Sequence, residues 1–257
     1  MNEQKYPRLE KLHILRTEAL CSMRDRAFDT PQFFFKNHSD GILSGCELHT
    51  TKNSITLSAG IILHNNFLYL IKNEMSVNYA PTEEYVMLKI IFEPEILSEN
   101  FIQRNVKIIL SDDMNISDSE MELCRFKLKR GAVLRTKYTD FFDRATEFDT
   151  INSINVPYSS KNESTLSPEI TFAFAQEAKN FELEPEDFSF CQAALSRETL
   201  SAEQISFYVE RRLKIELPDK KNQTLYDNLC LILQEIISGR KRELKNFGRR
   251  RRGILLD

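Results

Sequence analysis

The sequence predicts an α+β protein with an N-terminal helix, a small antiparallel β domain of the barrel or sandwich type, and a helical C-terminal domain. The spacing of the apolar residues predicts this order. Near the N-terminus and beyond residue 167 they recur every three or four residues, as in a helix, whereas from about residue 40 they recur every second residue, as in a strand. With 257 residues, 41% of them hydrophobic, the chain is long enough to bury more than one core.

Residues 1–35 are predicted to form a helix followed by a docking strap. Apolar residues have mostly helical spacing over residues 7–28, whereas Phe28 to Phe35 contains Pro31. Because the residue before a proline is biased away from the helical conformation, we expect this last stretch to be extended. The residues expected to contact a partner are Phe33, Phe34 and Phe35. The alternative is that the helix packs on its own domain and the phenylalanines fill its core.

Residues 36–138 are predicted to form the antiparallel β domain. Apolar and polar residues alternate from Ser54 to Ala59, and Asn65-Asn66 lies in the middle of the apolar run IILHNNFLYLI. Asparagine tolerates the left-handed conformation of tight hairpin turns, so two strands should join there. Further strands are expected at Tyr85–Phe92, Val106–Leu110 and Leu123–Leu128.

Residues 139–167 are predicted to be a linker or loop region, because INSINVPYSSKNESTLS is rich in serine and asparagine and contains a proline. Residues 168–257 are predicted to be a helical domain with a basic C-terminal tail. Ser201, followed by Gln204, is a plausible helix start. The last helix has an apolar stripe that ends at Gly239 and consists of Leu225, Leu229, Ile232, Leu233, Ile236 and Ile237.

Composition excludes some classes of protein. Lys and Arg number 35 against 38 Asp and Glu, and this net charge of −3 argues against a wholly basic nucleic-acid binder. No apolar run resembles a signal peptide or approaches the roughly 18 residues needed to cross a bilayer, so we expect a cytoplasmic protein without a transmembrane segment. Five widely spaced cysteines in apolar contexts predict reduced, buried thiols: Cys21, Cys46, Cys124, Cys191 and Cys230.

Motifs for catalysis, cofactors and metals are missing from the sequence, so we expect a non-enzymatic protein with no cofactor and no metal site. The seven glycines include no GxGxxG or GxxxxGK spacing, and turns account for Gly41 and Gly45 in GILSG. Cys46 and His49 form a CxxH pair that lacks two further nearby ligands for zinc, so we interpret them as a buried thiol beside a surface histidine.

One carboxylate cluster lies in DFFDRATEFD. If this stretch is helical, Asp140, Asp143 and Glu147 share a face and could serve a hydrolase as an acid/base pair. Arg144 interleaves with them, and no histidine lies nearby. We therefore favour a solvated helix face, with the hydrolase as the least favoured function.

The clearest local indication of a binding function is a run of four consecutive arginines near the C-terminus: Arg249, Arg250, Arg251 and Arg252. They are able to neutralise phosphates of nucleic acid or anionic lipid, or to pair with carboxylates on a protein partner. The apolar residues Gly253 to Leu256 that follow favour the protein partner, because apolar side chains are best buried in a groove on another protein. Nucleic-acid binding through this tail is the alternative function.

The β-rich part also contains a series of short motifs. GILSG is followed by a strand pair around SAG and, some fifty residues later, by ELCRFKLKRG. The matching positions are Gly41, Gly45, Ala59, Gly60, Glu122, Leu123, Cys124, Arg125 and Gly131. In this order the motifs resemble those of β domains in bacteriophage tail and baseplate structural proteins, over residues 40 to about 135. Cys124 stands where alanine is more usual.

That resemblance implies a structural, oligomer-building component of a phage tail or of the baseplate of a phage-tail-like contractile injection system. It also implies other baseplate or tail proteins as partners in a multi-subunit complex. The protein would then be incorporated in a phage-like particle assembled in the cytoplasm.

Overall fold

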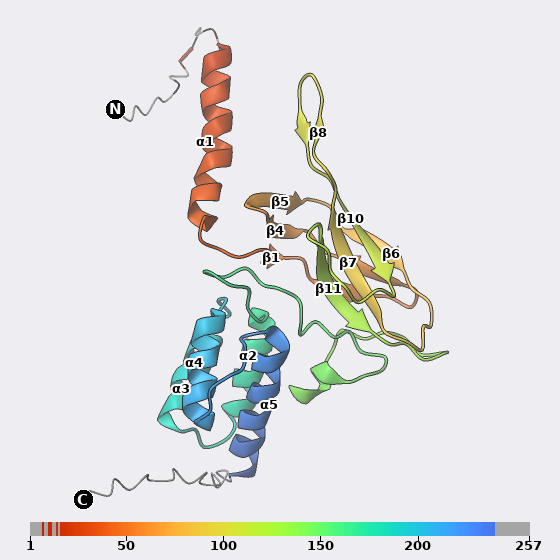
Figure 1. Cartoon of the computed structure of the whole chain (residues 1–257), viewed down its shortest axis with the longest axis vertical. Coiled ribbons are helices and arrows are strands. Elements are labelled where there is room, and N and C mark those ends of the chain that lie inside the picture. Colours follow the sequence, from red (N-terminus) through yellow and green to blue (C-terminus); the bar gives the residue numbers. More distant parts are fainter. Residues whose placement is uncertain (1–6, 8–9, 12–13, 15, 240–257) are drawn as a thin grey trace, which may run out of the picture.

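The computed structural model describes residues 7, 10–11, 14 and 16–239. Within them, one projecting helix precedes a group of small β-sheets, and a group of four helices follows (Figure 1). The predicted mixture of helix and antiparallel sheet is confirmed. The described helices are α1 (Thr17–Phe35), the 3₁₀ helix η1 (Phe142–Ala145), α2 (Pro168–Ala178), α3 (Pro185–Ala194), α4 (Ala202–Leu213) and α5 (Asn222–Ser238).

The strands of the sheet part are short. They are β1 (Gly41–Gly45), β2 (Leu48–Thr50), β3 (Ser54–Leu57), β4 (Gly60–His64), β5 (Phe67–Ile71), β6 (Met75–Asn78), β7 (Val86–Phe92), β8 (Ile96–Leu97), β9 (Ile102–Gln103), β10 (Val106–Ser111) and β11 (Glu120–Phe126). Their orders are β1-β4-β5, β2-β3-β6 and β10-β7-β11, with β8 and β9 as a separate hairpin.

None of these sheets closes into a barrel, so that form of the prediction is wrong for the part of the chain that the structure describes. A barrel needs every strand paired on both edges, whereas each three-stranded sheet here ends in two edge strands. The apolar side chains of the three sheets instead pack together in one shared core. Its largest fully buried side chains include Ile42, Ile55, Leu57, Ile62, Leu88, Ile90 and Phe126.

The β4–β5 hairpin forms where the asparagines predicted it. Asn65 and Asn66 both have positive φ, 48° and 62°, and the flanking residues His64 and Phe67 are paired. These are the left-handed conformations that a two-residue hairpin turn requires. GILSG, in contrast, is strand β1 rather than a turn.

The four C-terminal helices enclose a second core. α4 begins with the predicted capping box, in which Ser201 Oγ accepts from the Gln204 backbone N–H and Gln204 returns a bond to the Ser201 N–H. The apolar stripe of α5 is buried at Leu225, Leu229, Ile232, Leu233 and Ile236. Helical periodicity therefore located this core correctly.

Residues 139–167, predicted as a linker, form a junction that belongs to both cores. Phe141, Ile154 and Leu166 are buried among the helices, and Ile151 and Val156 are buried with the sheets. The stretch contains no regular element longer than η1. Its apolar side chains nevertheless anchor it on both sides, so it holds the sheets and helices together.

A seam of backbone hydrogen bonds, between residues 39–42 and 157–160, attaches this junction to the start of the sheet part. Ser159 N–H donates to Ile42 O, and Ile42 N–H donates to Pro157 O, each at 2.9 Å. Gly41 makes the approach possible, because a Cβ there would lie 2.7 Å from Pro157 O. Its φ of +151° is also one that other residues rarely adopt.

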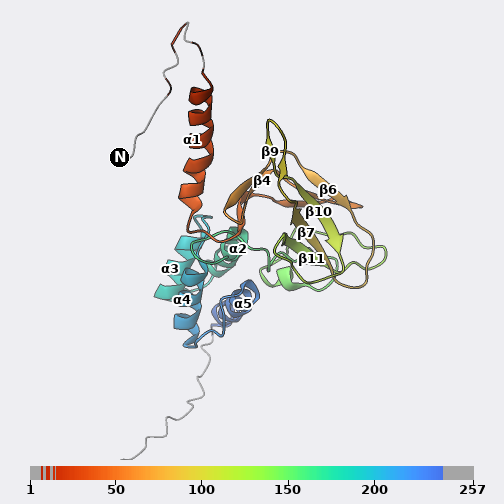
Figure 2. The same cartoon turned by 45° about the horizontal axis from the view of Figure 1, so that its top comes forward.

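α1 differs from its prediction. Phe28 to Phe35 is not extended but forms the C-terminal turns of the helix, with Pro31 inside it. Proline removes one N–H donor but has a φ that suits a helix, so it did not end this one. α1 contains no buried residue, and apart from a small contact with β5 it projects from the rest of the molecule (Figures 1 and 2).

Replacing Gly41 by alanine should lower the free energy of unfolding by about 1–3 kcal/mol, because the added Cβ must push the two sides of the seam apart. Urea unfolding followed by circular dichroism measures this change. Gly131→Ala is the matched control, since Gly131 also has a positive φ (82°) but nothing lies near its missing Cβ. Equal losses in the two variants would show that backbone strain, and not close packing of the seam, makes glycine necessary at position 41.

Candidate functional site

The surface of α1 is unusually apolar for an exposed helix. Phe28, Phe33 and Phe34 have 64%, 74% and 75% of their surface exposed, and Leu20 and Met23 are also largely exposed. Leu20, Met23, Ala27 and Phe34 are separated by three, four and seven residues, the spacing of a helix–helix contact stripe. This stripe is the kind of surface that another chain covers.

A second exposed apolar element is the β8–β9 hairpin. Its large side chains Ile96, Leu97, Phe101 and Ile102 are all more than half exposed. The hairpin extends from the sheets toward the same end of the molecule as α1 in Figures 1 and 2. We call α1 and this hairpin together the docking surface. The sequence signal that was overlooked is the pair of apolar dipeptides on either side of Ser98–Asn100.

The predicted partner-binding residues have different outcomes. Phe33 and Phe34 are exposed on α1. Phe35 is half-buried, and its ring meets the edge of the His38 ring at a centroid distance of 5.3 Å. Arg249, Arg250, Arg251 and Arg252 lie outside the described residues. Two of the three predicted phenylalanines are therefore exposed, and their contact with a partner stays a prediction.

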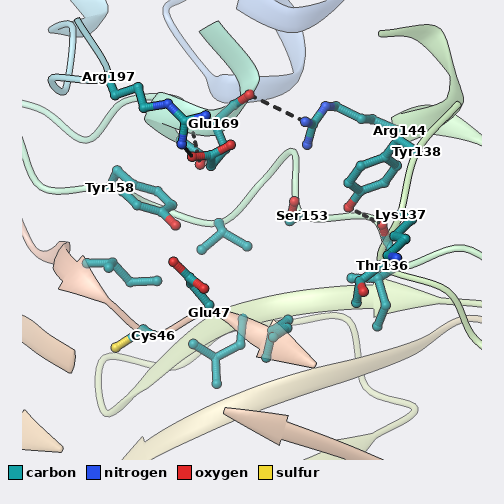
Figure 3. Close-up of a pocket in the computed structure, with 16 residues that line it drawn as sticks. Cys46, Glu47, Thr136, Lys137, Tyr138, Arg144, Ser153, Tyr158, Glu169 and Arg197 are labelled. Carbon is teal, nitrogen blue, oxygen red and sulfur yellow. Dashed lines mark hydrogen bonds and ion pairs between the residues drawn. The ribbon is translucent and has the colours of Figure 1, made fainter. Parts of the chain in front are cut away.

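A pocket of about 650 Å³ lies between the sheets and the helices (Figure 3). Its lining comes from the start of the sheet part, the junction, and the beginning of α2. Polar and charged residues of the lining include Glu47, Thr136, Lys137, Tyr138, Arg144, Ser153, Tyr158, Ser167, Glu169 and Arg197. Because both cores contribute, the pocket depends on how the junction holds them together.

Arg144 is the buried cation of this pocket, with only 9% of its surface exposed. Its guanidinium carbon lies 4.2 Å from the centre of the Tyr138 ring, and Nη2 donates to the Glu169 backbone carbonyl at 3.3 Å (Figure 3). Nε is buried without a hydrogen-bond partner among the described residues. Burial lowers the pKa of Arg144, since the charged form loses hydration. The sequence interpretation, which placed this arginine on a solvated helix face, is wrong.

Asp143, the neighbour of Arg144, is also buried and does not face solvent. Arg135 donates to both of its carboxylate oxygens, at 2.5 and 2.6 Å, and the backbone N–H of Thr139 donates at 2.8 Å. The Arg135 guanidinium and these hydrogen bonds hold the pKa of Asp143 well below its usual range. Asp143 is therefore a structural anion that fixes the turn carrying Arg144.

The other carboxylates of this cluster have separate partners. Asp140 accepts from the Asp143 backbone N–H, and the exposed Glu147 pairs with Lys127 Nζ at 2.7 Å. The stretch is a single turn of 3₁₀ helix and not an α-helix, so the predicted shared face does not form.

The cysteines are all free, as predicted. Cys46, Cys124 and Cys191 are buried, whereas Cys21 and Cys230 are half-buried. Burial raises the pKa of Cys46 to about 11. His49 is exposed, which confirms the interpretation of Cys46 and His49 as a buried thiol beside a surface histidine.

No group of three or more histidine, cysteine, aspartate or glutamate side chains gathers as a metal site within residues 16–239 or the other described positions. None of the described helices combines the length and apolar content needed to cross a membrane.

Comparison with solved structures finds a distant likeness. A crystal structure of TssK resembles this chain with a TM-score of 0.44 and 10% sequence identity. The likeness covers 91% of this chain and 72% of that chain, and it is a loose one, at the level of the general arrangement of elements. No protein-family model and no curated protein matches the sequence.

Asp143→Asn should lower the free energy of unfolding by about 1–3 kcal/mol at pH 7, because the Arg135 guanidinium loses its buried charged partner. The pKa of Asp143 is depressed in the folded chain, so the contribution is fully present above the unfolded value of about 3.9. It is lost as the pH falls below that value toward the folded pKa. Urea unfolding at pH 7 and pH 3 should therefore give a larger difference between wild type and variant at pH 7.

The exposed Asp112 provides the control for this experiment, since Asp112→Asn makes the same chemical change at the surface. It should alter stability by less than about 0.5 kcal/mol at either pH. A difference for Asp143→Asn that does not shrink at pH 3 would contradict the role assigned to its charge.

Proposed function

We propose that this chain is a non-enzymatic structural component of a phage-tail-like or contractile injection baseplate, and that it docks to neighbouring subunits through the docking surface. The observation that carries the proposal is α1, a helix of 19 residues with no buried residue and with exposed phenylalanines. In proteins, most of the stability of a helix comes from packing of its apolar face against another surface. A partner that covers the apolar stripe supplies that packing.

The energetics favour docking by both elements together. Full burial of one phenylalanine or leucine side chain is worth about 1.5–3 kcal/mol, and association costs at least about 4 kcal/mol in lost freedom. The free energy gained by burying Phe28, Phe33 and Phe34 is therefore only slightly larger than the free energy lost on association. The β8–β9 hairpin adds a second apolar patch, which makes a stable contact attainable.

Charged residues surround the apolar stripe on α1 without interrupting it. Arg24 and Asp25 form an exposed ion pair at 2.5 Å, and Glu18 and Asp29 lie on the same helix. An apolar centre with a polar rim is typical of interfaces between subunits that also exist separately.

The baseplate setting is supported by the sequence motifs. GILSG is strand β1, Ala59 and Gly60 lie where β3 passes into β4, and ELCR is part of β11. These motifs resemble those of phage tail and baseplate β domains, and they all lie in the sheet part. The proposed partners are accordingly other baseplate or tail subunits.

Affinity purification of the tagged full chain from its native cells, with nuclease present, tests the proposal. Mass spectrometry should then identify tail-tube, sheath or baseplate-like chains in the purified material. Recovery of the chain without such proteins, together with nucleic acid that is lost on nuclease treatment, would favour binding through Arg249–Arg252 instead.

Changing Phe33 and Phe34 together to serine should reduce recovery of partner subunits at least tenfold, because two anchors of the contact lose their apolar surface. The melting temperature of the isolated chain should not fall, since neither ring is buried. Phe207→Ser on α4 is the matched control, as this phenylalanine is 63% exposed but lies outside the docking surface. Equal recovery by the double variant and the control would remove α1 from the proposed interface.

A further inference from the structure

The buried guanidinium of Arg144 is poorly satisfied by the protein itself. A guanidinium carries five N–H donors, and the described residues supply one accepting oxygen, the Glu169 carbonyl, at 3.3 Å. Its Nε has no partner, and no carboxylate forms an ion pair with it in the part of the chain that the structure describes. Burying a cation without an anion is costly, so a merely structural contact would be served better by a neutral donor.

The surroundings of Arg144 also attract negative charge. Arg144, Lys137 and Arg197 line the pocket against Glu47 and Glu169, so the lining has a net charge of 3 − 2 = +1. Glu169 and Arg197 form an exposed pair at 3.2 Å, which leaves Arg144 as the most buried cation of the pocket lining.

The start of α2 also borders the pocket, and the Glu169 carboxylate in its first turn offsets part of the positive end of the helix dipole. Ser167, its N-cap, and Glu169, in its first turn, both line the pocket. An 11-residue helix presents the positive end of its dipole there. Figure 3 shows Glu169 and Arg144 facing each other across the upper side of the pocket.

The opposite wall comes from the sheets and the junction and is mainly apolar, although Glu47 projects into the pocket from this side (Figure 3). Its apolar residues are Ile42, Leu48, Leu123, Ile151 and Val156. A volume of about 650 Å³ lies in the range of small-molecule sites. A ligand that fits must therefore have an anionic group at one end and an apolar body.

We propose that this pocket binds a small carboxylic acid in its ionised form, with the carboxylate on Arg144 and the apolar body against the sheet-side wall. A planar carboxylate matches the paired donors of a guanidinium. A single negative charge suits a lining of net charge +1, whereas a phosphate dianion would be repelled by Glu47 and Glu169. This site is separate from the docking surface and does not depend on the proposed function.

Hexanoate and its neutral amide, hexanamide, are probes matched in size. Calorimetric titration of the full chain at pH 7 should show hexanoate binding at least tenfold more tightly than hexanamide. Inorganic phosphate at equal ionic strength should not displace it. Equal affinity for the acid and the amide, or binding of neither at millimolar concentration, overturns the proposal.

Arg144→Met keeps an unbranched, flexible side chain and removes the guanidinium with its charge. Hexanoate affinity should fall at least tenfold, and the melting temperature without ligand should rise, because an unpaired buried charge is replaced by an apolar side chain. Arg211→Met, at an exposed arginine of α4, is the matched control and should change neither quantity. Undiminished hexanoate binding by Arg144→Met overturns the assignment. If Arg144→Met does not fold, the comparison of hexanoate with hexanamide on the unaltered chain still tests whether the pocket binds a carboxylate.

Discussion

The seam between residues 39–42 and 157–160 is the constraint on which the rest of this structure depends. Its backbone bonds, each at 2.9 Å, bring the end of α1, the first strand and the junction to one place. Only a residue without a side chain allows so close an approach at Gly41. Without the seam, the backbone of the junction would, among the described residues, be bridged to the sheet part only through Phe148, Thr150 and Asn152.

Two consequences follow from that attachment. The base of α1 is fixed, because Ser39 and Asn37 just beyond it bond to Ser160 and Asn162. The rest of the helix makes only a small contact with β5 and buries no residue, so its apolar stripe is largely exposed to solvent. The same junction also places Arg144 between the two cores, where its charge is removed from water by both.

Much of the fold could be predicted from the sequence, because the spacing of apolar residues and the residue types at turns and helix caps are local features. The Asn65-Asn66 hairpin and the Ser201–Gln204 capping box formed where expected. The stripe of α5 was expected and is buried except for Ile237, which is 40% exposed.

The predictions failed where contacts between segments distant in the sequence determine the structure. α1 continues through Pro31, and the serine-rich stretch 139–167 is anchored by apolar residues without regular spacing. Arg144 and Asp143 looked like surface charges because their partners, at Glu169 and Arg135, are not neighbours in a helical pattern.

Hydrogen exchange of the α1 amides, measured by mass spectrometry, tests most directly the claim that this helix is a docking element. In the isolated chain, at a concentration where it is a monomer, amides of Thr17–Phe35 should exchange at least tenfold faster than those of α5, because no packing protects them. In the assembled particle the same amides should become protected. Protection of α1 equal to that of α5 in the isolated monomer would show that the helix packs on its own body, and would contradict the account.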